Sequence, residues 1–243
     1  MGQKVNPVAF RVGVMEGWKS RWYAPKKEYG ALLVEDKKIR DYIKKHKDKD
    51  AKDRKGELSF PCVAKIEIER TRDELRVIVT TARPGLIIGS KGQRAKELQA
   101  ELQDLTGRRV KLDVNEEKNP ELVAQLVAED IGDQLVKRAS FRRVIKRAMA
   151  NAMEKGAKGI KIQLSGRLGG AEMARCEKQA EGSIPLSTLR AKIDYGFHEA
   201  KIAQGHIGIQ VWINQGEYSE DDNNGQNAEK SSSSKTTKRA YKR

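Results

Sequence analysis

One stretch decides the fold of the first half of this chain: Pro84-Gly85-Leu86-Ile87-Ile88-Gly89-Ser90-Lys91-Gly92. Pro84-Gly85 ends a strand, and the apolar residues after it predict a short helical turn. Beyond the loop glycines, leucines recur at helical spacing over residues 93–106, and Gly107 ends that helix. A G-x-x-G loop between two helical segments is therefore expected at residues 89–92.

The sequence on either side of this loop predicts an α+β domain. Apolar residues recur at helical spacing from Lys27 to about Lys45, and apolar residues alternate with polar ones at 64–69, 75–79 and 110–114. The predicted order of elements over residues 26–118 is α-β-β-α-α-β. Residues 46–56 are almost wholly charged and predict a solvated insertion after the first helix.

The G-x-x-G spacing is informative only in its context. It occurs at 89–92, 156–159, 166–169 and 205–208, but the last three border predicted strands. At 89–92 the absent side chains would let phosphates approach the backbone, Lys91 adds charge, and the next helix presents its N-terminus to an anion. Gly89, Ser90, Lys91 and Gly92 are therefore candidate RNA-binding residues. The alternative is that the two glycines only turn the chain. The loop is not a nucleotide-binding P-loop, because G-x-x-x-x-G-K-[ST] does not occur.

The second half predicts another α+β domain, residues 119–216, with an antiparallel sheet. Asn119-Pro120-Glu121 predicts the start of a helix that runs to about Arg138, and Ser140 can cap a second predicted helix that runs to Lys155. Alternation predicts strands at 160–164, 189–195 and 207–213. Residues 217–243 are rich in Asp, Asn, Ser and Lys and predict a disordered tail whose basic end touches RNA loosely.

The helix from Ser140 concentrates positive charge. Arg142, Arg143, Lys146 and Arg147 fall on one arc at about 100° per residue. No acid occurs between residues 137 and 147. The opposite arc is apolar, so we expect it to pack on its own domain. A merely solvated helix face is the alternative, but such faces usually mix both signs, so the unmixed charge favours contact with phosphates.

The composition also indicates a polyanionic partner. Lys and Arg total 49 against 34 Asp and Glu, which gives a formal net charge of +15. An anionic membrane is the competing partner, but aromatics make up only 5% and no apolar run approaches the ~18 residues of a membrane span. Without an apolar leader, the chain is expected to be cytoplasmic. Residues 1–25 predict an N-terminal arm, whose Trp18, Trp22 and Tyr23 either stack on RNA or dock on their own domain.

Neither a catalytic set nor a metal site is expected. Cys62 and Cys176 lie far apart and predict buried or half-buried small side chains, and the three histidines lack zinc-ligand spacing. Ser165 lacks the G-x-S-x-G turn of hydrolases. We therefore expect no enzymatic activity and no cofactor.

Several longer motifs resemble one known family, the bacterial-type third protein of the small ribosomal subunit. They cover residues 1 to about 216 in the order of that family. The motifs are Met1-Gly2-Gln3-Lys4-Val5-Asn6-Pro7, Thr81-Ala82-Arg83-Pro84-Gly85, Phe141-Arg142-Arg143 with Lys146-Arg147, Gly156-Ala157-Lys158-Gly159-Ile160, Ser165-Gly166-Arg167-Leu168-Gly169-Gly170-Ala171-Glu172, and Pro185-Leu186 before Thr188-Leu189-Arg190.

The resemblance implies a type II KH domain followed by the C-terminal domain of that family, in the head of the small subunit. Its partners would be small-subunit ribosomal RNA, messenger RNA, and the tenth and fourteenth small-subunit proteins. In this family the basic helix faces the channel through which messenger RNA enters and helps to open structured messages. That role carries over to Arg142, Arg143 and Lys146. Other expected RNA contacts are Lys4, Arg11, Arg83, Arg147 and Arg167.

The chain departs from the family pattern at three places. Ser90 stands where relatives often carry a second lysine, residues 47–56 lengthen a connection, and Lys178-Gln179-Ala180 replaces aromatic and basic residues. Two other functions are the alternatives: a free KH-domain regulator of messenger RNA, and a nucleic-acid-processing enzyme. The enzyme would require a metal or carboxylate constellation, and the regulator would not need the block from Ser165 to Glu172.

Overall fold

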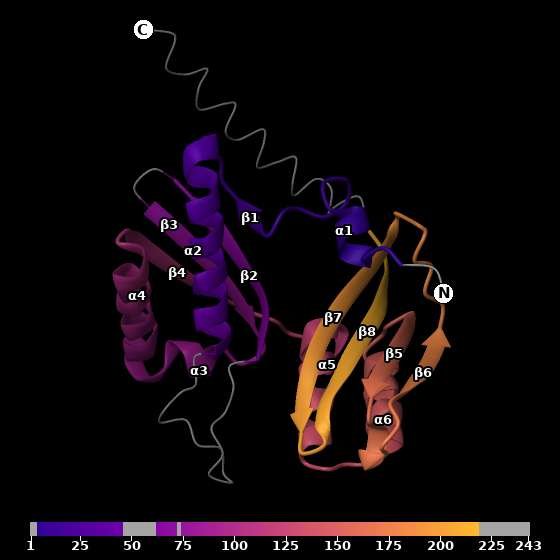
Figure 1. Ribbon diagram of the computed structural model, residues 1–243. Coiled ribbons are helices and arrows are strands. Elements are labelled where there is room, and N and C mark those ends of the chain that lie inside the picture. The colour runs from indigo at the N-terminus through magenta and orange to yellow at the C-terminus, as the bar shows by residue number, and fades with distance from the viewer. Residues whose placement is uncertain (1–3, 46–61, 72–73, 219–243) are drawn as a thin grey trace, which may run out of the picture. The chain divides into compact units, whose positions relative to one another are not determined.

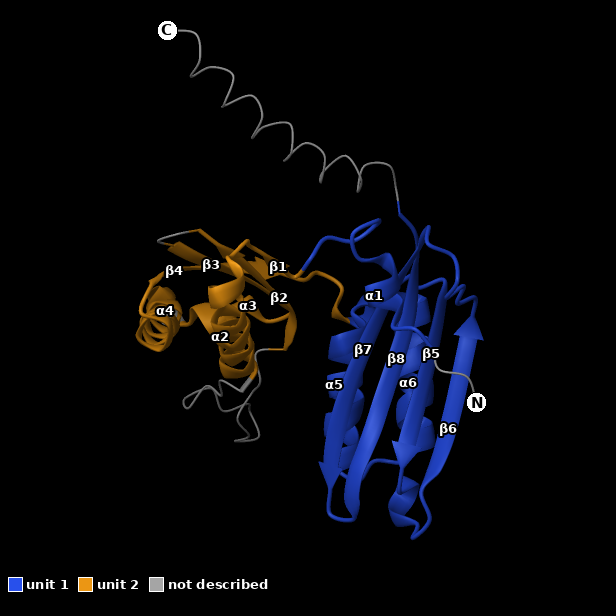
Figure 2. Cartoon of the chain, turned by 45° about the horizontal axis from the view of Figure 1, so that its top comes forward, with its two compact units in different colours: residues 1–18, 121–243 blue, residues 19–120 orange. Residues whose placement is uncertain are grey.

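The computed structural model describes residues 4–45, 62–71 and 74–218. The predicted insertion at 46–56 and all of the predicted tail (217–243) except Glu217 and Tyr218 lie outside these residues. The chain forms two compact units (Figure 2). The G-x-x-G unit spans residues 19–120, and the basic-helix unit combines residues 1–18 with 121–243. The first 25 residues, predicted as a single arm, are therefore divided between the two units.

The G-x-x-G unit contains a four-stranded sheet with the order β1-β2-β3-β4. The pair β2–β3 is antiparallel, whereas β1–β2 and β3–β4 are parallel. Its elements are β1 (Ser20–Arg21), α2 (Lys26–Lys45), β2 (Val63–Arg70), β3 (Glu74–Thr81), α3 (Pro84–Ile88), η1 (Ser90–Gly92), α4 (Gln93–Thr106) and β4 (Arg109–Glu116) (Figure 1). From α2 onward they follow the predicted order α-β-β-α-α-β. The two-residue strand β1 is too short for an apolar alternation, and it forms by pairing with β2.

Apolar side chains from the helices and the sheet make the core of this unit. Ile39 and Ile43 of α2 and Leu98 and Leu102 of α4 are at most 3% exposed, and they belong to the same cluster as β2, β3 and β4 residues. Because alternate strand residues point to opposite faces, the other face of the sheet is polar. The charged residues on it pair across strands, as in Arg76 Nε to Asp113 Oδ2 at 2.6 Å and Lys111 Nζ to Glu74 Oε2 at 2.7 Å.

A buried carboxylate joins the start of this unit to its sheet. Asp36 of α2 is 1% exposed and accepts hydrogen bonds from Ser20 Oγ (2.9 Å), Trp22 Nε1 (2.8 Å) and Arg70 Nε (2.8 Å). Trp22 therefore docks on its own unit, which was one of the two alternatives predicted for it; the other was stacking on RNA. Trp18 and Tyr23 are 67% and 94% exposed.

The basic-helix unit contains a second four-stranded sheet, with the order β6-β5-β8-β7 and every pair antiparallel. This sheet and the α+β class agree with the prediction. Helices α5 and α6 cover one face of it, and the short helix α1 lies on the other (Figure 2). The elements are α1 (Pro7–Arg11), α5 (Ala124–Val136), α6 (Phe141–Glu154), β5 (Gly159–Gly166), η3 (Leu168–Gly170), β6 (Arg175–Gly182), β7 (Ala191–Ile202) and β8 (Gly205–Glu217).

Two expectations for this half need correction. The sequence predicted three strands, but β6 is a fourth: it carries no large apolar side chain and forms by pairing along β5. The helix predicted from Asn119 begins instead as the 3-10 turn η2 (Pro120–Leu122), followed by extended Val123. Helix α5 starts afresh at Ala124, because the Ala124 N–H donates to Asp194 Oδ2 of β7 at 2.7 Å. That cap comes from a residue distant in sequence.

Candidate nucleic-acid interface

The backbone of the G-x-x-G loop follows a path that suits glycine. Gly89, Lys91 and Gly92 all have left-handed φ angles, of +69°, +55° and +74°. A Cβ on Gly89 would lie 2.6 Å from Arg94 Cγ, whereas one on Gly92 would meet no heavy atom within 4 Å. Gly89 therefore provides close packing as well as the turn.

An anion could reach two kinds of donor at this loop. The exposed Lys91 provides an ammonium group. Helix α4 begins directly after Gly92 and has no side-chain cap, so its first backbone N–H groups are available to an external acceptor. The arrangement can bind a phosphate through backbone and side chain together. All four loop residues, Gly89 to Gly92, are thus in the predicted place between α3 and α4.

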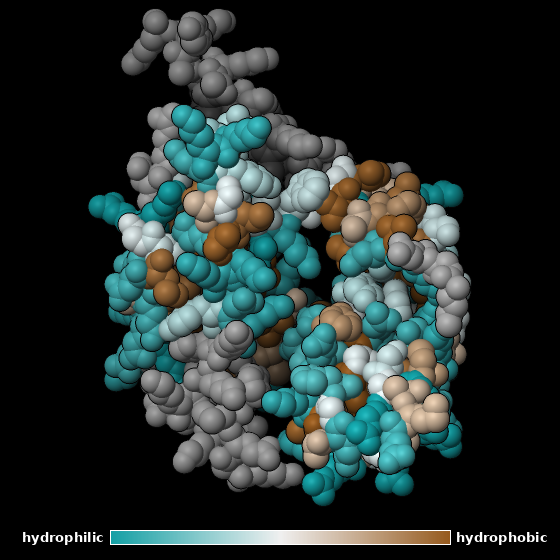
Figure 3. All heavy atoms as spheres, viewed as in Figure 1, coloured by the Kyte–Doolittle hydropathy of each residue, from teal (hydrophilic) through white to brown (hydrophobic). Residues whose placement is uncertain are grey.

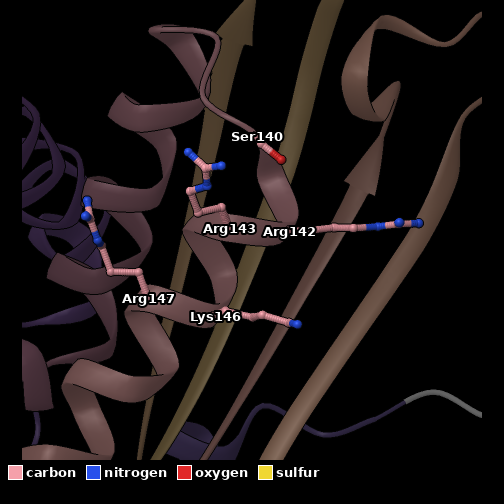
Figure 4. A pocket seen from close by; sticks show the side chains of 5 residues that line it. All are labelled: Ser140, Arg142, Arg143, Lys146 and Arg147. Atoms are coloured by element: carbon pink, nitrogen blue, oxygen red, sulfur yellow. The ribbon is translucent and has the colours of Figure 1, made fainter.

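Helix α6 presents its cations on a rigid support. Val144, Ile145, Met149 and Ala152 are at most 7% exposed in the core of the unit, whereas Arg142, Arg143, Lys146 and Arg147 are all exposed. The four cations line a shallow pocket together with Ser140. In Figure 4, Arg142 and Lys146 point to one side of the helix, Arg147 points to the other, and Arg143 lies between them. A phosphate that approaches the exposed arc of α6 would therefore meet cations on a helix whose other arc is packed in the core.

A strand that the sequence did not predict contributes to this surface. Glu177 of β6 lies 3.9 Å from Arg142 and 3.7 Å from Arg175, and both guanidinium groups lie within 6 Å of the Phe141 ring centroid, at 5.6 and 5.4 Å. Glu177 therefore places a carboxylate beside Arg142. Among the described residues, Arg143, Lys146 and Arg147 make no ion pair.

The expectation that Arg11 contacts RNA is wrong. Arg11 is 0% exposed, and its guanidinium donates to the carbonyl oxygens of Pro7 (2.9 Å), Thr188 (2.8 Å) and Ala191 (2.7 Å). A buried guanidinium needs acceptors, and the carbonyls of the 185–191 segment provide them. Arg11 holds α1 against β7 instead.

The remaining candidate residues differ in their surroundings. Lys4, Arg83 and Arg147 are exposed. Arg167 is half-buried and donates to the carbonyl oxygens of Ala171 (2.9 Å) and Gln204 (3.2 Å), so part of its binding capacity holds the turn around η3.

Within the described residues, the two cysteines differ in their exposure. Cys62 is half-buried as predicted, but Cys176 is exposed because it lies on the edge strand β6. No group of three or more potential ligand side chains in the described part of the chain is placed to hold a metal ion. None of the helices described here combines the length and apolar character needed to cross a membrane. The face in Figure 3 is largely hydrophilic, with apolar residues in small groups.

The fold and its cationic surfaces are those of an RNA-binding protein, and comparisons with known proteins specify the family. The family described as "KH domain" matches residues 38–122, and "Ribosomal protein S3, C-terminal domain" matches residues 131–213. The small ribosomal subunit protein uS3 of Rhodopirellula baltica is 63% identical over 243 residues, the full length of both chains. That of Desulforudis audaxviator is 49% identical over 217 residues, which cover 89% of this chain and 94% of the relative.

The chain therefore belongs to the family of small ribosomal subunit protein uS3. This membership confirms the predicted family and the predicted fold class. It also agrees with the prediction that the chain is not an enzyme, because the relatives are named as ribosomal proteins.

Proposed function

We propose that this chain is a structural constituent of the cytoplasmic small ribosomal subunit. There it binds small-subunit ribosomal RNA in the head and lines the channel through which messenger RNA enters. Its protein partners in this proposal are the tenth and fourteenth small-subunit proteins. The observation that carries the proposal is α6: four exposed cations and no acid on one arc of a helix whose other arc is buried.

Arg142, Arg143 and Lys146 are the residues through which α6 would act on messenger RNA. Arginine binds phosphate with two parallel N–H groups, and lysine adds a point charge. Because Val144 and Ile145 fix the helix, binding requires little reordering of the backbone. In this proposal the surface holds one strand of a structured message by its phosphates and so helps to keep the opened strand apart from its pairing partner.

The G-x-x-G unit would bind ribosomal RNA through its loop. Gly89 and Gly92 let a phosphate approach the start of α4, Ser90 lies between them in the chain, and Lys91 supplies charge. Arg83, just before α3, is exposed on the same unit. In the basic-helix unit, Lys4, Arg147 and Arg167 complete the proposed RNA contacts.

Sedimentation tests the ribosomal part of the proposal. A tagged chain expressed in cells should migrate with small subunits in a sucrose gradient of the lysate. A free KH-domain regulator of messenger RNA would instead remain in light fractions or follow messenger RNA alone. Absence of the chain from small-subunit fractions would contradict the assignment.

The channel role has its own test, in the triple variant Arg142→Ala, Arg143→Ala and Lys146→Ala. Subunits should still assemble, because all three side chains are exposed. Translation through a strong hairpin in the message should slow, while an unstructured message is translated at the wild-type rate. A control variant with Lys26, Lys37 and Lys38 of α2 changed to Ala removes the same charge from exposed positions. Equal translation of the hairpin message by both variants would contradict the channel role.

A further inference from the structure

The sheet of the basic-helix unit has a face on which Lys4 is the one RNA contact proposed above. Ile160, Ile162 and Leu164 of β5 are buried against α5 and α6, so Lys161, Gln163 and Ser165 point to the opposite face. The strand register extends this face into rows. One row is Lys178, Gln163, Gln210 and Phe197, from β6, β5, β8 and β7, and the next is Ala180, Lys161, Trp212 and Tyr195.

Three lysines gather at the β6–β5 side of this face. Lys161 lies in the row next to Lys178, and its Nζ is 5.0 Å from the Trp212 ring centroid. The chain before α1, which carries Lys4, crosses the same face toward β6 (Figure 2). Partial burial lowers the pKa of Lys161, and the neighbouring positive charges of Lys4 and Lys178 lower it further. The amino groups are thus close enough to repel one another.

Carboxylates do not offset this repulsion in the described residues. Lys4, Lys161 and Lys178 take part in none of the ion pairs there. In the rows across this face, the acidic residue is Glu199 of β7, the strand at the far side of the sheet from β6. Like charges held together at a surface lower the stability of the folded chain unless an anion binds them.

We propose that this face, centred on Lys4, Lys161 and Lys178, binds the phosphates of an RNA strand in addition to those bound by α6. The inference rests on the proposed function, that the chain works on RNA. The same face offers groups for the rest of a nucleotide: Gln163 and Gln210 as hydrogen-bonding side chains, and Phe197, 44% exposed, as a stacking surface. An acidic protein segment would use only the lysines, so the neighbouring amides and the ring favour RNA.

The test uses the purified full chain and a fluorescent oligouridylate of about 20 nucleotides, whose bases stack weakly on one another. Binding is measured over a range of KCl concentrations for the wild type and for Lys161→Gln/Lys178→Gln. The double variant should bind about tenfold more weakly at low salt, and its slope of log K against log[KCl] should fall by about 1.4, since each phosphate contact on a single strand contributes about 0.7. The matched control, Lys155→Gln/Lys158→Gln, removes two exposed lysines of the same unit and should bind as the wild type does.

A charge-preserving variant guards against a folding effect. Lys161→Arg/Lys178→Arg should retain wild-type affinity and slope, and weak binding by this variant would contradict a role of charge at this face. Wild-type binding by Lys161→Gln/Lys178→Gln, alongside weakened binding by Arg142→Ala/Arg143→Ala/Lys146→Ala, would overturn this inference and leave the proposed function standing. Unchanged binding by both would count against both. If poly-glutamate of similar length displaced the RNA at equal charge concentration, the face would be a site for acidic segments, and the inference would be wrong.

Discussion

The exposed sheet faces of the two units differ in how they handle charge. In the G-x-x-G unit, cations and acids stand on neighbouring strands, so that Lys111 of β4 lies 2.7 Å from Glu74 of β3 and Arg76 of β3 lies 2.6 Å from Asp113 of β4. In the basic-helix unit, Lys161 and Lys178 stand on neighbouring strands with no carboxylate among them. The composition of the whole chain is basic, but only the second face leaves its lysines for an external anion.

The comparison teaches that strand register, more than the number of lysines, decides whether a charge is available. An acid diagonally across a strand pair, as Asp113 is to Arg76 and Glu74 is to Lys111, pairs with the cation, since diagonal neighbours on one face lie within reach of long side chains. The same acid one residue along the strand would point to the other face. The two units also differ in the groups that they offer to an anion. The G-x-x-G loop offers backbone N–H groups and one lysine, whereas α6 offers side chains alone.

Substitution of a buried charged residue should give the largest difference in stability between the two units. Asp36→Ala should destabilise the G-x-x-G unit by about 3–5 kcal/mol, because it leaves the buried guanidinium of Arg70 with Glu35 but without Asp36 and removes the acceptor of Trp22 Nε1. Arg11→Ala should cost the basic-helix unit less, about 2–3 kcal/mol, because it removes the charge itself and leaves neutral carbonyl acceptors. Amide hydrogen exchange measured separately in the two units checks both values. An Arg11→Ala cost equal to or above that of Asp36→Ala would contradict this account, and Asp36→Asn, which keeps the shape, serves as the intermediate control.

Variants of the G-x-x-G loop should separate its contribution to RNA binding from that of α6. Gly89→Asp with Gly92→Asp should weaken binding of small-subunit RNA fragments about tenfold at fixed salt, by loss of backbone approach and by charge repulsion. Gly92→Asp alone is the sharper variant, because a Cβ at Gly92 meets nothing within 4 Å, whereas one at Gly89 clashes with Arg94. Wild-type binding by Gly92→Asp, measured by filter retention, would count against the loop as a contact. Gly107→Asp, at another left-handed glycine with open space around it, is the control.

The smallest effect should come from freeing the paired cations of the first sheet. Glu67→Gln with Glu69→Gln removes the carboxylates beside Arg21, Lys65 and Arg76. RNA binding should strengthen only about two- to fivefold at low salt, and stability should change by less than about 1 kcal/mol, because exposed ion pairs are weak. Fluorescence anisotropy with the oligouridylate measures the first effect. Weaker binding than the wild type would show that pairing does not mask these cations.

Much of the fold could be predicted from the sequence because it follows from local rules. The alternation around Ile66 and Val77 and the helical spacing around Leu98 and Leu102 identified β2, β3 and α4, and the glycines placed the loop between α3 and α4. Strand β6 was missed because no apolar alternation marks an edge strand that is exposed. The start of α5 was misplaced because its cap, Asp194, is 70 residues away in the chain.

The sequence by itself determined the class of this protein: a basic chain with a G-x-x-G loop between helices and an acid-free cationic arc on one helix. Those features are local, and both periodicity and charge can be counted along the chain. Only the tertiary structure decided which cations are free to bind. It buried Arg11 among carbonyls, placed Glu177 beside Arg142, and brought Lys4, Lys161 and Lys178 together on one sheet face. The physical reason is that the availability of a charge depends on its neighbours in space, which strand register and packing set over separations that no local pattern spans.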